Sequence, residues 1–153
     1  MAAPDRARSR RAARRLALAA IFEADFGQRT AVAVLERHLA EGEADPLTAE
    51  HARLLVEVVV ARRDAIDATI ERLAPQYPVV QLARMDRALL RCGIGEVLHS
   101  GATPARVAIA EWVELARIYS GEPARRLVNG VLGRVGSEAG ASEVPEARTT
   151  ERP

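Results

Sequence analysis

Apolar residues recur at intervals of three and four along most of the chain, and this periodicity restricts the possible fold more than any other feature. Such spacing places apolar side chains on one face of a helix. No window alternates apolar and polar residues as a half-buried strand does, and no Asn-Gly turn joins two such windows. The sequence therefore predicts an all-α protein, folded as a compact bundle of six to seven helices.

Six segments carry this pattern, and residues that start or interrupt helices lie at their ends. Ser9, Thr48 and Thr103 are candidate N-caps, because their hydroxyl groups can accept hydrogen bonds from free backbone N–H groups. Pro75 and Pro78 break a helix, so we expect a seam there that divides the bundle into two three-helix halves. The predicted helices run over residues 9–26, 30–41, 48–74, 80–100, 103–120 and 123–135.

Length and composition indicate one globular domain with two short unstructured ends. The chain of 153 residues is 48% hydrophobic but only 3% aromatic, so Leu, Val, Ile and Ala must build the core. Gly130 lies within an apolar stripe and is expected where two helices cross closely. The predicted domain spans residues 9–135, preceded by a flexible basic arm over residues 1–8. Residues 136–153 lack periodicity and are predicted to form a disordered tail.

Nothing in the chain indicates membrane insertion or export. No apolar run reaches the length of about 18 residues that a membrane span needs. The basic N-terminus is not followed by the apolar stretch of a secretory signal. Cys92 is the single cysteine, so no disulfide can form within the chain, as expected in a reducing compartment. We therefore expect a cytoplasmic protein.

Residues that could perform catalysis or bind a metal lack suitable partners. Glu96 and His99 have the Glu-x-x-His spacing of carboxylate-bridged metal sites, but the sequence contains no second copy. Cys92 lies on an apolar helix stripe, where an inert core thiol is expected. Glu111 and Glu114 fit a solvated helix face. The chain is therefore predicted not to be an enzyme and to need no metal or cofactor.

Arginine is concentrated at the start of the chain. All 22 basic residues are arginine, and six of them fall within residues 6–15. A cluster of this kind favours an anionic partner, usually nucleic acid or a membrane surface. Codon usage can explain the preference for arginine over lysine, but it does not explain the clustering. The last 18 residues, 136–153, instead contain four glutamates and two arginines.

A helical wheel of the first segment separates two faces. Small residues suited to close packing form one face. The opposite face starts with arginines and continues into apolar and aromatic residues: Arg8, Arg11, Arg15, Leu18, Phe22 and Phe26. Two interpretations remain open. Either this helix is central and buried on both sides, or the arginines bind phosphates beside an apolar surface for a protein partner.

Five stretches of the chain form an ordered set: residues 10–14 (RRAAR), 20–22 (AIF), 85–91 (MDRALLR), 107–111 (VAIAE) and 127–132 (LVNGVL). In order and in spacing, they resemble the NusB family of all-helical RNA-binding proteins. The likeness covers about residues 8–135 and implies the two-part helical bundle of that family. Five positions depart from the family pattern. Phe22 stands where the family has Tyr, Ala110 where it has Asn and Leu127 where it has Phe. Gly133 replaces its Asp, and Pro123 stands where many members have an acidic residue.

The resemblance implies a transcription antitermination factor. NusB-like proteins pair with NusE, a protein of the small ribosomal subunit, and the pair binds boxA-type single-stranded RNA in nascent ribosomal transcripts. With other Nus factors, the complex prevents RNA polymerase from terminating. Unpaired RNA offers phosphates to arginines and bases to other side chains. The resemblance implies RNA contacts by Arg10, Arg11, Arg14, Arg84 and Arg126, and contacts with NusE by Phe22 and Asp86.

Two other functions remain open at this point. The same helical domain forms the N-terminal part of certain ribosomal RNA cytosine methyltransferases, where it would direct an enzyme to RNA. Alternatively, the chain is a homodimeric protein-interaction module that buries its arginine-bearing helix face.

Overall fold

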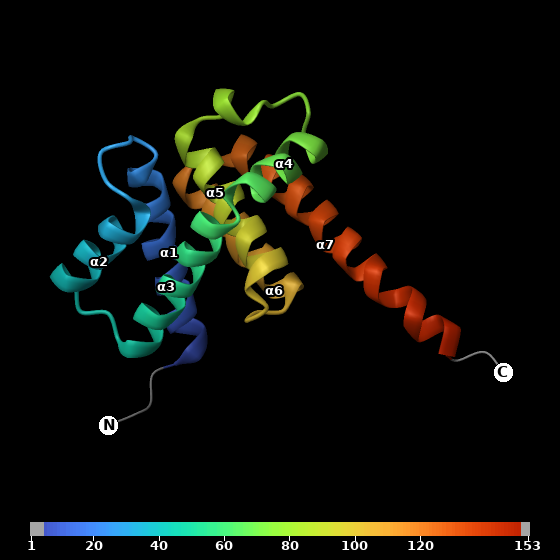
Figure 1. Cartoon of the computed structure of the whole chain (residues 1–153), viewed down its shortest axis with the longest axis horizontal. Coiled ribbons are helices and arrows are strands. Elements are labelled where there is room, and N and C mark those ends of the chain that lie inside the picture. Colours follow the sequence, from blue (N-terminus) through green and yellow to red (C-terminus); the bar gives the residue numbers. More distant parts are fainter. Residues whose placement is uncertain (1–4, 151–153) are drawn as a thin grey trace.

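The structure is a computed structural model that describes the backbone of residues 5–150 and the side chains of residues 5–140 (Figure 1). Over these residues the chain is helical, with no strand, as the periodicity predicted. The elements are α1 (Arg6–Ala24), α2 (Ala31–Glu41), α3 (Pro46–Ala61), α4 (Arg63–Leu73), η1 (Val79–Gln81), α5 (Arg84–Ile94), η2 (Gly95–Ser100), α6 (Ala105–Tyr119) and α7 (Glu122–Thr150). η1 is a 3₁₀ turn and η2 is a π-helical continuation of α5.

The helices form two groups that meet along α1 and α5. α1 packs against α2 and α3 in the first group, and α5 packs against α6 and α7 in the second (Figure 1). Direct packing of α1 on α5 joins the groups. Among the residues that the structure describes, no helix is both long enough and apolar enough to cross a bilayer.

Small residues allow α1 to lie close to its neighbours. Ala13, Ala17 and Ala20 are fully buried, and α1 packs more extensively against α3 than against any other helix. The core is otherwise built from Leu, Ile and Val, as the composition required, with Trp112 as its largest side chain. Because α1 is anchored through its alanine face, its orientation determines which of its arginines reach solvent.

The long third helix predicted over residues 48–74 is divided at Arg62 into α3 and α4. No proline or glycine marks this break. It reorients α4 so that Ile66 and Ile70 become fully buried while α4 packs against α5 and α7 of the second group. The two groups therefore separate near Arg62, before the predicted seam at Pro75 and Pro78.

Three predicted N-caps are replaced by neighbouring residues. Asp5 caps α1 by accepting from the N–H groups of Ala7 and Arg8, and Asp45 caps α3 by accepting from Thr48 N–H at 2.8 Å. The Ser9 hydroxyl instead donates to Asp45, which ties the start of α1 to the start of α3. A carboxylate accepts these bonds more strongly than a hydroxyl does. The third, Thr103, lies before α6, whose first residue is Ala105.

Both ends of the helical region extend beyond the predicted domain. α1 begins at Arg6, within the predicted arm, and α7 continues past Gly136 to Thr150 and projects from the body (Figure 1). A Cβ at Gly136 would lie 2.8 Å from Ile109 Cδ1, so α7 still packs closely on α6 at the point where a disordered tail was predicted to begin. Residues 1–4 and 151–153 lie outside the described residues.

The close helix crossing expected at Gly130 occurs elsewhere. Gly130 is exposed, and a Cβ there would meet nothing within 4 Å, so that prediction is wrong. Gly93 and Gly95 have this role instead. A Cβ at Gly93 would lie 2.8 Å from Leu132 of α7, and one at Gly95 would lie 3.0 Å from Val59 of α3.

Candidate nucleic-acid interface

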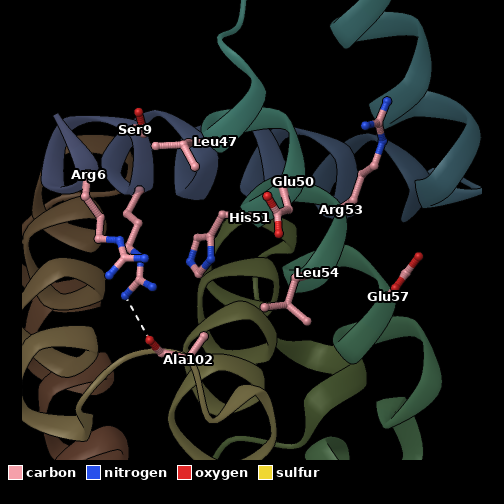
Figure 2. Close-up of a pocket in the computed structure, with 10 residues that line it drawn as sticks. Arg6, Ser9, Leu47, Glu50, His51, Arg53, Leu54, Glu57 and Ala102 are labelled. Atoms are coloured by element: carbon pink, nitrogen blue, oxygen red, sulfur yellow. Dashed lines mark hydrogen bonds between the residues drawn. The ribbon is translucent and has the colours of Figure 1, made fainter. Parts of the chain in front are cut away.

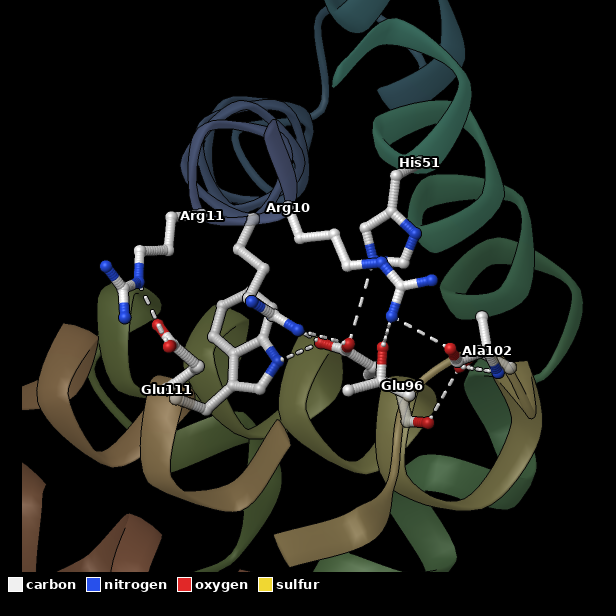
Figure 3. A network of polar contacts seen from close by, with 10 residues as sticks. Arg10, Arg11, His51, Glu96, Ala102 and Glu111 are labelled. Carbon is white, nitrogen blue, oxygen red and sulfur yellow. Dashed lines mark hydrogen bonds and ion pairs between the residues drawn. The ribbon is translucent and has the colours of Figure 1, made fainter. Parts of the chain in front are cut away.

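The outer face of α1 presents three exposed arginines, Arg8, Arg11 and Arg15, which we call the arginine face. They follow one another at intervals of three and four residues, so they share one side of the helix. Arg11 donates to Glu111 of α6 at 3.1 Å while 59% of its side chain remains exposed (Figure 3). Arg8 and Arg15 form no ion pair within the described part of the chain. This face therefore offers positive charge to solvent.

Arg10 lies at the edge of the arginine face and is partly fixed. One of its terminal nitrogens donates to the carbonyl oxygen of Ala102 at 2.9 Å and to the Thr103 hydroxyl at 3.0 Å (Figure 3). Both acceptors are uncharged, so the positive charge of Arg10 is not neutralised. The remaining guanidinium N–H groups are free to donate to a ligand.

Arg14 is buried and cannot reach a ligand on the surface. Its guanidinium donates two hydrogen bonds of 2.8 Å to the carboxylate of Glu96, and the two side chains are 2% and 0% exposed. The indole N–H of Trp112 donates to the same carboxylate at 2.7 Å, and His51 Nε2 lies 3.7 Å away (Figure 3). The expectation that Arg14 contacts RNA is corrected accordingly: Arg14 holds α1 against η2 and α6.

This buried cluster keeps Glu96 ionised. Burial alone would raise the pKa of Glu96, but hydrogen bonds from Arg14 and Trp112, the charge of Arg14 and the nearby His51 imidazole outweigh it and hold the pKa well below 4.5. The Glu96 carboxylate is therefore occupied by the ion pair with Arg14 and is not available as a metal ligand. Over the described residues, no group of three or more His, Cys, Asp or Glu side chains could hold a metal ion.

In the sequence, Glu96 stands out only as half of a metal-ligand spacing with His99. Its partners in the cluster lie 82 and 16 residues away in the chain, and no local pattern connects them. One signal was available, because Glu96 lies among the apolar residues Ile94, Val97 and Leu98, where a carboxylate needs a partner.

Cys92 is buried, and burial raises the pKa of its thiol, which agrees with the inert core role predicted for it.

Arg84 and Arg126 occupy different parts of the surface. Arg84, at the start of α5, is half-exposed, and its guanidinium carbon lies 4.3 Å from the centre of the Phe26 ring. It also lies 3.8 Å from the Asp25 carboxylate at the end of α1, so its charge is partly balanced there. Arg126 is 74% exposed and lies 3.7 Å from Glu122 on α7. It borders a separate hollow that Tyr77 and Leu127 also line. In the described part of the chain, no hydrogen bond or ion pair joins Arg126 to α1.

Phe22 lies near the C-terminal end of α1, and Asp86 lies in the first turn of α5. Phe22 is half-buried, and its ring meets that of Phe26 edge-on at 5.3 Å between centres. Asp86 accepts a hydrogen bond from Ser120, the residue that follows Tyr119. A hollow of about 250 Å³, which we call the aromatic hollow, is lined by Arg15, Leu18, Ala19, Phe22, Glu23, Phe26, His38, Met85 and Tyr119.

The aromatic hollow continues directly from the arginine face. Arg15 belongs to both, so one side of α1 carries positive charge in its first half and apolar surface in its second. Of the two interpretations of this helix face, burial on both sides therefore does not hold for Arg8, Arg11, Arg15 or Phe26, which are exposed. It holds for Leu18, which is 1% exposed.

Comparison with known proteins shows which family this sequence matches. The NusB family description matches residues 11–137, from α1 into α7. A transcription antitermination protein NusB from Dehalococcoides mccartyi is 39% identical over 127 residues, covering 83% of this chain and 89% of that protein. The chain belongs to the NusB family. NusB proteins are transcription antitermination factors and not enzymes, in agreement with the prediction from sequence.

Solved NusB structures have the same fold. T. maritima NusB superposes with a TM-score of 0.79 at 29% identity, covering 90% of this chain and 94% of that chain. A chain from a complex of the antitermination factors NusB and NusE with double-stranded RNA superposes with a TM-score of 0.78 at 23% identity. That match covers 86% of this chain and 98% of the other, and it shows the shared fold. Arg6, Arg8 and Arg10 precede the part of the chain that the family description matches.

Proposed function

We propose that this protein is a transcription antitermination factor that binds boxA-type single-stranded RNA together with NusE and prevents premature termination by RNA polymerase. The observation that carries the proposal is the continuous side of α1, on which the arginine face adjoins the aromatic hollow. Family membership and the NusB–NusE complex with RNA among its structural neighbours support it. Such a factor acts in the cytoplasm, where transcripts are made, through NusE and other Nus factors.

In this proposal the two halves of the α1 surface have different roles. Arg11, with Arg8 and Arg15, binds phosphates, which position an RNA strand without reading its sequence. Arg10 contributes at the edge, and Arg84 and Arg126 extend the path over α5 and α7. NusE occupies the aromatic hollow, where an apolar side chain can bury the half-exposed rings of Phe22 and Phe26. Asp86 follows Met85 of the hollow in the chain, accepts a hydrogen bond from Ser120 and offers a carboxylate to NusE.

RNA binding with and without NusE tests the proposed function. The protein should bind a boxA-like single strand more tightly than a scrambled strand of the same length. Added NusE should tighten binding by about tenfold, a typical coupling between two ligands of one protein. Gel-shift or fluorescence anisotropy titrations measure both quantities. A protein that binds neither RNA nor NusE, or whose RNA binding is abolished by self-association at the same concentrations, would contradict the proposal in favour of a homodimeric module.

Phe22→Ala should weaken NusE binding by about 2 kcal/mol, or roughly 30-fold, because an aromatic anchor at the centre of an interface is removed. Phe22 is only half-buried, so the loss of folding stability should be smaller than the 3–5 kcal/mol typical of a fully buried Phe. Isothermal titration calorimetry with NusE and urea unfolding measure the two effects.

Leu39→Ala is the matched control, because Leu39 is also partly buried against the core but lies outside the aromatic hollow. It should lower stability to a similar extent and leave NusE affinity unchanged. An unfolded Phe22→Ala variant, or one with normal NusE affinity, would mean that Phe22 is a core residue and that NusE binds elsewhere.

A further inference from the structure

A second concave site lies on the other side of α1, away from the aromatic hollow. A cavity of about 500 Å³ opens between the first turns of α1, the start of α3 and the loop before α6 (Figure 2). We call it the α1–α3 cavity. Its volume falls within the range of about 300–1,000 Å³ typical of small-molecule sites. The residues that matter for its chemistry are Arg6, Arg10, Leu47, Glu50, His51 and Leu54.

One face of α3 forms a wall with apolar and acidic parts. Leu47, Glu50 and Leu54 follow at intervals of three and four residues, so their side chains share one side of the helix. Leu47 is 38% exposed and Leu54 is partly exposed, which leaves apolar surface open to a flat ligand. His51 lies between them, buried, with Nε2 unpaired by any hydrogen bond and directed to Glu96 (Figures 2 and 3). It closes the floor of the cavity.

Charge is separated across the α1–α3 cavity. On the α1 side, Arg6 and Arg10 have no acidic partner among the described residues, and they are one helical turn apart. On the α3 side, Glu50 likewise has no basic partner in the described part of the chain. Arg53, which also lines the cavity, is occupied by Glu36 through hydrogen bonds of 2.8–3.1 Å. Figure 2 shows Arg6 and Glu50 on opposite sides of His51.

A ligand that fits this arrangement has an anionic group at one end, a flat apolar body, and N–H donors at the other end. A nucleotide has all three. Its phosphate would meet Arg6 and Arg10, and its base would lie against Leu47 and Leu54. A carboxylate presents two acceptor oxygens and no donor. It therefore pairs with guanine, whose Watson–Crick edge offers two adjacent N–H donors, and is repelled by the carbonyl oxygens of uracil.

We propose that the α1–α3 cavity binds an unstacked guanine nucleotide of the RNA strand, with Glu50 reading the base and Arg6 and Arg10 holding its phosphate. The proposal rests on the proposed RNA-binding function and adds a source of sequence preference that phosphate contacts cannot supply. The first turn of α1 borders the cavity and also carries Arg8 of the arginine face, so one strand can reach both.

The test uses two short single-stranded RNAs that differ at one position, guanine in one and uracil in the other. The parent protein should prefer the guanine strand. Glu50→Gln should weaken binding of the guanine strand by about tenfold, within the range measured for one bidentate side-chain–base pair, and should change binding of the uracil strand by less than about twofold. Glu71→Gln, which removes an exposed acid of α4 outside the cavity, is the matched control and should leave both affinities unchanged.

The sign of the Glu50→Gln effect separates this role from simple electrostatics. A carboxylate that is merely near RNA repels it, so its neutralisation would tighten binding of both strands. Arg6→Ala should weaken both strands equally, whereas Arg29→Ala, an exposed arginine of the α1–α2 loop, should weaken neither.

Two failures are distinguishable. A parent protein that binds neither RNA overturns the proposed function together with this subsite. A parent protein that binds both strands alike, or a Glu50→Gln variant that keeps the parent's preference for guanine, overturns the guanine subsite alone. Glu50 is exposed, so thermal unfolding of Glu50→Gln should match that of the parent and exclude a folding defect.

Discussion

Arg14→Met should lower the free energy of unfolding by about 3–5 kcal/mol, the cost of removing one partner from a buried ion pair. The substitution keeps much of the side-chain volume but removes both 2.8 Å hydrogen bonds to Glu96. Glu96 is fully buried and would keep only Trp112 and His51 as polar neighbours. Urea unfolding followed by far-UV circular dichroism measures the change, and the fluorescence of Trp112 reports on the cluster itself.

Two further variants make this prediction specific to the buried charge. Arg11→Met breaks an ion pair whose arginine is 59% exposed, and such a pair contributes at most about 1 kcal/mol. The double variant Arg14→Met with Glu96→Gln leaves no buried charge in the pair, so it should recover most of the lost stability. A single variant within about 1 kcal/mol of the parent, or a double variant no more stable than the single one, would show that the pair does not hold α1 in place.

The same cluster predicts how stability depends on pH. The pKa of Glu96 in the folded protein lies below its ordinary value of 4.5. Its contribution is therefore fully present above about pH 4.5 and is lost as the pH falls from there towards the folded-state pKa. The parent should lose stability over this acid range more steeply than the double variant, which lacks the carboxylate.

Replacing Arg8, Arg11 and Arg15 with Ala should remove a large part of the salt dependence of RNA binding. Each phosphate neutralised on a single strand contributes about −0.7 to the slope of log K against log salt, so three lost contacts should make the slope shallower by about 2. At about 0.1 M salt this corresponds to an affinity roughly 100-fold lower. All three side chains are exposed, so the free energy of unfolding should fall by no more than about 1 kcal/mol, the most that the Arg11–Glu111 pair contributes.

Salt titrations with boxA-like and scrambled RNA provide the measurement. Both RNAs should weaken by similar factors, because the arginine face contacts phosphates and not bases. A variant with Arg29, Arg62 and Arg63 replaced by Ala loses the same charge from exposed positions on the α1–α2 loop and the α3–α4 junction. It should keep nearly the parent slope. Equal slopes for the parent and the Arg8, Arg11 and Arg15 variant would place the RNA path on another side of the molecule.

Helix content and family could be predicted from sequence because both depend on the spacing and order of residues along the chain. The spacing of Leu55, Val59, Ile66 and Ile70 marks a helical face whatever lies against it, and the resemblance to NusB is read from residues in order. Even so, helix limits were misplaced where the deciding contact is distant. Arg62 interrupts a helix that no local signal ends, and α7 passes Gly136 because that glycine packs against Ile109 of α6.

Only the tertiary structure decided which arginines of α1 can meet a ligand. Arg14 and Arg15 are adjacent residues of the same type, so amino-acid composition cannot distinguish their roles. A rotation of about 100° about the helix axis separates them. It sends Arg15 to solvent and Arg14 to Glu96, 82 residues away in the chain. The sequence alone therefore determined that the first helix is strongly basic. The role of each arginine depended on packing between helices, because that packing decides whether its guanidinium contacts a buried carboxylate or solvent.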